Sequence, residues 1–141
     1  MGPTLLGHPM TSLVQLISFG YRHAPPPEAD ITLDTRRLLR DPHVDPALRE
    51  LTGLDDPVRT HVMGTPGALC LSVNTAATVR QLLGDLTVPH QVVVAVGCAG
   101  GRHRSVALTE QIAALLDDGS APVAIHHRDV DRPVLPADSH R

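Results

Sequence analysis

One short segment combines the residue types that bind phosphate. It reads Gly97-Cys98-Ala99-Gly100-Gly101-Arg102-His103-Arg104-Ser105 and follows a β-branched run at 91–96. Its glycines let successive main-chain N–H groups point inward, and a helix that starts here adds unpaired donors and the positive end of its dipole. Arginines add charge-assisted hydrogen bonds to phosphate oxygens. The sequence therefore predicts an anion-binding turn, since a turn built for packing alone would not need Arg-His-Arg-Ser beside its glycines.

The same segment supports an enzymatic alternative. Cys98 and Arg104 follow the pattern C-x5-R-S, which resembles the phosphate loop of cysteine-dependent phosphatases. In such a loop a thiolate at a helix start attacks phosphorus, and the arginine binds the equatorial oxygens. Two features differ from that pattern: Gly97 stands where histidine is usual, and the only aspartate that the sequence nominates as general acid is Asp56, whose neighbour Pro57 indicates a helix cap instead. In the binding alternative the N–H of Cys98 matters and its sulfur does not, and both alternatives stay open.

Polar residues also follow the other predicted strands. They lie at 22–23 (Arg-His), 34–36 (Asp-Thr-Arg) and 126–129 (His-His-Arg-Asp). Because the carboxyl ends of parallel strands meet at one edge of a sheet, we expect these residues to converge on the glycine turn. Asp34 and Asp129 are expected to hold arginines in place. Together these residues predict a basic pocket.

We expect no metal and no cofactor. His103, His126 and His127 lack a recognised ligand spacing and a cysteine pair, and adjacent histidines rarely ligate one ion together. Cys70 and Cys98 form no CxxC pair, and Cys70 is expected to be a small core residue because it lies in an apolar stretch.

Composition excludes several functions. All twelve basic residues of the 141-residue chain are arginine, which excludes a Walker lysine, Schiff-base chemistry and a lysine base. The net charge of −3 provides no general attraction to nucleic acid or to an anionic membrane. Only Phe19 and Tyr21 are aromatic, too few for a single-strand nucleic-acid groove. With neither a membrane-spanning run nor the basic flank of a signal peptide, the expected location is the cytoplasm.

Apolar periodicity predicts an α/β fold with a small, mostly parallel sheet of about four strands and flanking helices. The predicted strands are 13–19, 31–35, 91–96 and 122–125. The predicted helices are 46–51, 57–63, 66–86 and one that carries Leu108, Ile112, Leu115 and Leu116. Asp45 and Asp56 are expected N-caps, each followed by proline. The 66–86 helix is expected to bury Val73, Ala76, Val79, Leu82 and Leu83.

Two further expectations concern connections and boundaries. Only about ten residues link the first two strands, fewer than a parallel crossover usually needs, and we favour a parallel arrangement with a compact turn. Residues 1–10 are expected to form a flexible N-terminus, 11–131 a single domain, and 132–141 a flexible tail.

A series of motifs then points to a family. They are Ser18-Phe19-Gly20-Tyr21-Arg22-His23, Asp34-Thr35-Arg36, Asp41-Pro42-His43, Leu51-Thr52-Gly53-Leu54-Asp55, the glycine turn, and His127-Arg128-Asp129. In this order they resemble the C-terminal domain of the RNase adapter protein RapZ, or YvcJ, family of nucleotide-binding proteins. The resemblance covers about residues 13–130.

The resemblance implies a phosphate-binding regulatory role. It implies a sensor for a phosphosugar of the glucosamine-6-phosphate type, with an architecture similar to a sugar-phosphate-binding half of phosphofructokinase and, in enterobacteria, binding of a small RNA. It adds Arg36, His43 and Arg128 to the residues of the turn as ligand contacts. Full-length members carry an N-terminal P-loop domain; this sequence holds no Walker motif, so we expect a stand-alone domain and do not transfer nucleotide hydrolysis to it.

The function expected from the sequence is a regulatory module that binds a phosphosugar or a nucleotide. The alternatives are an RNA-binding adapter, against which the acidic net charge counts, and a cysteine-dependent phosphatase that uses Cys98 and Arg104. The corresponding partners are a phosphorylated small molecule, RNA, a separate P-loop NTPase chain and a second copy of this chain. No membrane partner is expected.

Overall fold

The computed structural model describes residues 4–5, 8–9, 13–85, 91–119 and 121–136. Its main sheet has four parallel strands in the order β4-β5-β3-β6. The strands are β3 (Leu13–Gly20), β4 (Ile31–Asp34), β5 (Gln91–Cys98) and β6 (Val123–His127). The short strands β1 (Thr4–Leu5) and β2 (His8–Pro9) pair antiparallel in a separate sheet. The predicted parallel α/β fold is confirmed.

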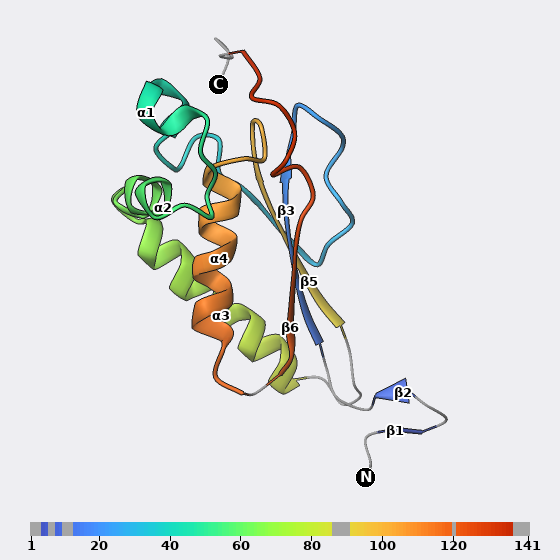
Figure 1. The fold of residues 1–141 in the computed structure, drawn as a ribbon. Coiled ribbons are helices and arrows are strands. Elements are labelled where there is room, and N and C mark those ends of the chain that lie inside the picture. The colour runs from blue at the N-terminus through green and yellow to red at the C-terminus, as the bar shows by residue number, and fades with distance from the viewer. Residues whose placement is uncertain (1–3, 6–7, 10–12, 86–90, 120, 137–141) are drawn as a thin grey trace.

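Four helices flank the main sheet. They are α1 (Pro46–Arg49), α2 (Asp56–Met63), α3 (Ala68–Asp85) and α4 (Arg104–Leu116), and a 3-10 turn, η1 (Pro42–Val44), precedes α1. The helices gather on one side of the sheet, whereas the loop between β3 and β4 lies on the other side (Figure 1). None of the helices in the described ranges is long and apolar enough to cross a membrane.

The short link between the first two strands is explained by the strand order. β3 and β4 are parallel but not adjacent, because β5 lies between them. The link therefore does not have to wrap a helix over neighbouring strands. Asp30 fastens its end to β5, since its N–H donates to Val93 O at 2.8 Å and its carboxylate accepts the Val93 N–H at 2.7 Å. The parallel arrangement with a compact turn is confirmed.

The core lies between the sheet and the helices. Alternate residues of β3 and β5 point toward the helices, and α4 buries most of its length because it contacts β3, β5, α2 and α3. The largest buried aliphatic side chains on these three elements are Val14, Leu16, Val92, Val94, Val96, Leu108 and Ile112. This packing makes α4 and its first turn a rigid part of the core.

The buried face of α3 differs from the prediction. Ala76 and Val79 are buried as expected, but Val73 is 44% and Leu82 36% exposed, and Ser72 and Thr75 are buried instead. The inner face uses small residues because α3 packs closely against α4. The prediction that Cys70 lies in the core is wrong, since Cys70 is exposed on α3.

Two aspartate caps behave differently. Asp45 caps α1, where its carboxylate accepts the Ala47 N–H at 2.9 Å. The predicted cap at Asp56 is one residue off, because Asp56 is the first residue of α2 and Asp55 stands at the N-cap. The carboxylate of Asp55 accepts the Thr52 N–H at 2.8 Å and so closes the loop before the helix.

The glycine turn is held by backbone contact with the end of β3. A Cβ at Gly20 would lie 2.6 Å from Gly100 O and 2.7 Å from Gly101 N, so no side chain fits there. Gly101 has φ +73°, which favours glycine, and a Cβ there would lie 2.6 Å from Gly20 N. Gly97 lies under two rings, where a Cβ would be 2.6 Å from atoms of both Phe19 and Tyr21. These contacts explain why glycine, and not histidine, precedes Cys98.

A buried carboxylate fastens the same corner. Asp129 is fully buried and accepts hydrogen bonds from the Gly20 N–H at 2.8 Å, Arg128 Nη2 at 2.8 Å and Arg132 Nε at 3.0 Å. Burial raises the pKa of this carboxyl, but the three donors outweigh burial, so its pKa lies below the ordinary value of 3.8. The expectation that Asp129 holds arginines in place agrees with these contacts.

The close approach at Gly20 predicts a strong effect of one methyl group. Gly20→Ala should lower the free energy of unfolding by about 1–3 kcal/mol, because the backbone of the turn must move. The control is Gly84→Ala in α3, where nothing lies within 4 Å of the added Cβ. This control should raise stability by roughly 0.5–1 kcal/mol through helix propensity. Urea unfolding of both variants measures the difference, and equal stabilities would contradict the contact.

Removal of the Asp129 charge should destabilise the fold in a pH-dependent way. Asp129→Asn should lower the free energy of unfolding by about 3 kcal/mol at neutral pH. The reason is that the donors around Asp129 lose the buried negative charge that they bind. A carboxyl with a lowered folded-state pKa contributes stability above pH 3.8, its ordinary pKa, and loses it as the pH falls through the lower folded-state value. The gap to wild type in urea unfolding should therefore shrink in acid. A gap that stays constant with pH would refute this role, and Asp118→Asn, at an exposed ion pair, is the control.

Candidate functional site

The glycine turn closes around the sulfur of Cys98. Cys98 is the last residue of β5, and α4 begins at Arg104. The Gly101 N–H donates to Cys98 Sγ at 3.2 Å, and Cys98 Sγ lies 3.2 Å from Ser105 Oγ. A thiol donates its proton to Ser105 Oγ, and in an ionised state the serine hydroxyl donates to the sulfur instead. The turn therefore offers two donors to a thiolate.

Arg104 lies beside this sulfur and is almost completely buried. Arg104 is 3% exposed. Its Nη1 donates to Arg36 O at 2.9 Å, and its Nη2 lies 3.7 Å from Asp41 Oδ2. Burial lowers the pKa of Arg104, while the neighbouring Cys98 and Asp34 act in the opposite direction. The guanidinium remains charged, as arginine does in proteins. The turn thus holds a fixed, desolvated positive charge.

A cavity opens above the turn, at the carboxyl ends of β3 and β5. Its volume is about 450 Å³ including its mouth. Its walls come from the glycine turn, the η1 region, the start of the β3–β4 loop and the C-terminal segment. The lining residues are Arg22, Asp41, His43, Cys98, Ala99, Gly100, Arg102, His103, Arg104 and 133–136. This is the edge at which ligands bind in open α/β sheets.

The segment 133–136 forms one wall of the cavity, although the sequence indicated a loose tail there. Arg22 Nη1 donates to Pro136 O at 2.6 Å, and His43 Nε2 donates to Leu135 O at 2.9 Å. Arg102 Nη1 donates to Arg132 O at 3.2 Å just before this wall. Basic side chains thus bind main-chain carbonyls that no apolar pattern could reveal. The domain boundaries at 11 and 131 stay a prediction.

Two predicted site residues line the cavity but point their polar groups elsewhere. Arg102 donates to Leu51 O at 3.0 Å and also to Glu50 O. His103 Nε2 donates to Arg49 O at 2.9 Å, and burial lowers the pKa of His103. Both side chains tie the segment after α1 to the turn. Their main-chain N–H groups, at the start of α4, have no partner within the helix.

Arg36 and Arg128 are not among the cavity-lining residues. Arg36 pairs with Asp34 at 2.6 Å, which lowers the pKa of Asp34, and its guanidinium lies 3.8 Å above the Tyr21 ring. Arg128 binds Asp129 and donates to Pro25 O at 2.7 Å. Arg36 still supports the site, because its carbonyl accepts from Arg104. Any direct ligand contact of these two arginines stays a prediction.

Some of the remaining residues of the glycine turn line the cavity, and the others do not. Ala99 and Gly100 face the cavity with Cys98, whereas Gly97, Gly101 and Ser105 are not among its lining residues. Ser105 is fully buried behind Cys98. A Cβ at Gly100 would meet nothing within 4 Å, so this glycine leaves open space on the cavity wall.

The sequence did not single out Asp41 as a site residue. It nominated Asp56 as the acid from a separate loop, but Asp56 starts α2 and is not among the cavity-lining residues. Asp41 caps η1 by accepting the His43 N–H at 3.0 Å, and the same carboxylate reaches Arg104. Both Asp41 and Asp56 precede a proline, so the sequence shows the same helix-start pattern at both positions. Only the packing of η1 against the turn distinguishes them.

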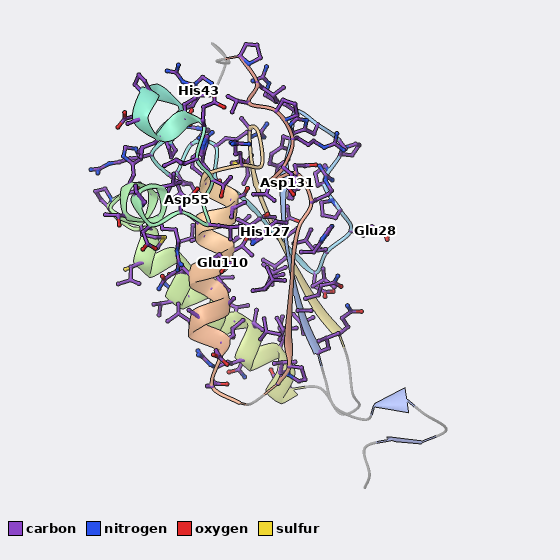
Figure 2. All side chains as sticks on the ribbon, in the orientation of Figure 1. Glu28, His43, Asp55, Glu110, His127 and Asp131 are labelled. Carbon is purple, nitrogen blue, oxygen red and sulfur yellow. The ribbon has the colours of Figure 1, made fainter. Side chains whose placement is uncertain are left out.

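The histidines that the structure describes do not gather around an ion site. Within the described ranges, no three His, Cys, Asp or Glu side chains are grouped to hold a metal. His127 lies instead between Ser18 Oγ at 2.7 Å and Glu110 Oε2 at 2.8 Å, and Figure 2 shows Glu110 and His127 where α4 and β6 face each other. Figure 2 also places His43 at the end of the molecule that carries α1, with the turn.

Comparisons with known proteins relate this chain to a family. Residues 12–131 match the RapZ C-terminal domain family. The chain is 44% identical to a nucleotide-binding protein of Thermobifida fusca over 83% of this chain and 40% of that protein. It is 38% identical to a nucleotide-binding protein of Heliobacterium modesticaldum over 84% of this chain and 40% of that protein. A nucleotide-binding protein of Thermus thermophilus is 44% identical over 90% of this chain and 46% of its own length.

The chain therefore spans less than half the length of these relatives. The family match over 12–131 contains the glycine turn and the cavity-lining residues other than 133–136. On the family match over 12–131, this chain belongs to the RapZ C-terminal domain family.

Proposed function

We propose that this domain is a regulatory module that binds a phosphorylated small molecule in the cavity above the glycine turn. The observation that carries the proposal is the buried guanidinium of Arg104, 3% exposed, on the cavity wall beside the start of α4. A desolvated cation at a helix N-terminus is costly for the fold alone. It is favourable when a dianionic group fills the cavity.

The first turn of α4 adds to this attraction. His103 stands at the N-cap of α4, and its side chain makes no hydrogen bond to the N–H groups of the first turn. These N–H groups can therefore donate to a ligand. The helix dipole places partial positive charge at the same point. Arg22 and His43 on the opposite wall add donors that now bind the carbonyls of 135–136. A phosphate could exchange with these carbonyls.

The cavity favours a phosphosugar over a nucleotide. None of its lining residues is Phe, Tyr or Trp, and the rings of His43 and His103 are held by hydrogen bonds to the carbonyls of Leu135 and Arg49. Phe19 is fully buried, and the face of Tyr21 is covered by Arg36, so neither ring is placed to stack on a base. The relatives are named nucleotide-binding proteins, but more than half of each lies outside the matched region. A sugar hydroxyl needs only the polar donors and acceptors that line this cavity.

Removal of the Arg104 charge should weaken phosphate binding. Arg104→Ala should reduce the affinity for glucosamine 6-phosphate by roughly ten- to hundredfold, the value of one hydrogen bond to a charged group. Titration calorimetry measures the affinity, and the unphosphorylated sugar should not bind. The matched control is Arg80→Ala, an exposed arginine paired with Asp118 on the far part of the helical layer. Unchanged affinity in Arg104→Ala would place the ligand elsewhere.

A second variant separates folding from binding. Gly100→Asp adds a carboxylate in open space, so the protein should fold with a melting temperature close to that of Gly100→Ala. Its negative charge should nevertheless repel a phosphate and remove the thermal shift that the ligand causes in Gly100→Ala. Equal ligand-induced shifts in the two variants would contradict the proposed position of the phosphate.

RNA binding receives less support. Arg22, Arg102 and Arg128 donate to main-chain carbonyls, and the net charge is −3. We therefore expect a labelled structured RNA to bind no more tightly than about 10⁻⁶ M at physiological salt, the tight end of the range for non-specific binding. An electrophoretic shift at lower protein concentration, with an affinity that falls steeply as salt rises, would favour the RNA-binding adapter instead.

A further inference from the structure

A binding role leaves one feature of the turn without a purpose. The main-chain N–H groups, Arg104 and the open position at Gly100 are sufficient to hold a phosphate. Cys98 nevertheless places its sulfur at the base of the cavity, 2% exposed, with the Gly101 N–H and Ser105 Oγ both at 3.2 Å. A serine hydroxyl could make the same two hydrogen bonds at this position. Sulfur differs from this hydroxyl in its nucleophilicity.

We propose that Cys98 is a phosphoryl acceptor, so that the module hydrolyses phosphates whose leaving group departs as a stable anion, such as aryl phosphate monoesters and acyl phosphates. This inference rests on the proposed function, because the same cavity must first bind the phosphate. The surroundings of the sulfur provide what a nucleophilic thiolate requires. The Gly101 N–H donates to the sulfur, and the Ser105 hydroxyl can donate to it once the thiol has lost its proton. The start of α4 and the guanidinium of Arg104 lie beside it.

The first step transfers the phosphoryl group to sulfur. The Cys98 thiolate attacks phosphorus, an S–P bond forms, the P–O bond to the leaving group breaks, and the leaving group departs with the electron pair as its anion. Arg104 and the first N–H groups of α4 bind the equatorial oxygens, where charge is spread in the transition state. No proton has to be supplied in this step when the leaving group is a phenolate or a carboxylate.

The second step returns the thiolate. Water attacks phosphorus of the phosphocysteine, the S–P bond breaks, and the electron pair returns to sulfur. The proton of the attacking water goes to the carboxylate of Asp41, which lines the same cavity, and inorganic phosphate leaves. An aspartate is ordinarily ionised at neutral pH and can then accept a proton. Asp41 Oδ2 lies 3.7 Å from Arg104 Nη2, close to the bound phosphate.

The state of Asp41 also sets the substrate class. An alkoxide leaving group, such as that of a sugar phosphate, needs a proton donor in the first step. An ionised Asp41 cannot donate one, and His43 donates its Nε2–H to Leu135 O. A phosphosugar therefore binds without turnover, whereas esters with acidic leaving groups react. The same cavity can thus be a sensor for one class and an enzyme for the other.

The test uses p-nitrophenyl phosphate and the full chain. Wild type should release nitrophenolate with turnover, and Cys98→Ser should reduce release to the rate without protein while it still binds inorganic phosphate in calorimetry. Cys70→Ser, which removes the exposed thiol on α3, is the matched control and should keep the full rate. Asp41→Asn should release about one equivalent and then stall, with a phosphoryl adduct on Cys98 in the intact mass.

The outcomes separate the two proposals. Phosphate binding without nitrophenolate release by wild type between about pH 5 and 8 would refute the nucleophile and leave the binding module intact. Equal release by wild type and Cys98→Ser would also refute it. Absence of both phosphate binding and release would refute the proposed function, and this inference with it. Release that disappears only in Cys98→Ser would establish the phosphoryl acceptor.

Discussion

Two stretches of bare backbone meet where β5 turns into α4, and the site depends on that contact. Gly20 at the end of β3 lies against Gly100 and Gly101, so closely that a Cβ at Gly20 or at Gly101 would overlap main-chain atoms. The Gly20 N–H is at the same time fixed by the buried carboxylate of Asp129. The strand end, the turn and the segment after β6 are therefore one packed unit. The turn is shaped before any ligand arrives, which is the condition for strong electrostatic binding.

Most of the arginines around the turn act on the protein itself. Arg102 and Arg128 donate to carbonyls of distant segments, and Arg36 pairs with Asp34 and covers Tyr21. Arg104 differs, because it is buried, charged and on the cavity wall. The planar guanidinium suits both tasks, since it can satisfy several carbonyls in a fixed geometry or bind an oxyanion with two donors. The count of arginines near a site is thus a weak guide to the count of ligand contacts.

The segment 133–136 adds a constraint that the sheet alone would not impose. It lies over the cavity through hydrogen bonds of its main-chain carbonyls, not through buried side chains. Such contacts involve Arg22 and His43, the two basic residues opposite the turn. A ligand that enters the cavity therefore meets a wall made of the chain's own backbone. Because carbonyls and phosphate oxygens are both acceptors, they compete for the same donors.

The sequence by itself determined the parallel α/β fold and the strand-turn-helix unit at 91–116, and it predicted that the turn binds an anion. These follow from local rules: β-branched runs form buried strands, glycines allow tight turns, and a helix start carries unpaired donors. The caps were predicted to within one residue, because an aspartate before proline signals a helix start without stating which of two neighbouring aspartates caps it. Fold and loop were therefore readable from short windows.

Only the tertiary structure decided which polar side chains share the cavity. Asp41 and Asp56 look alike in sequence, yet only Asp41 lines the cavity, because η1 packs against the turn. The strand order placed β5 between β3 and β4, which removed the difficulty of their short link. Val73 and Leu82 are exposed although their spacing is helical, because the close packing of α3 on α4 selects small residues. Such outcomes depend on contacts between segments far apart in the chain, and no local pattern encodes them.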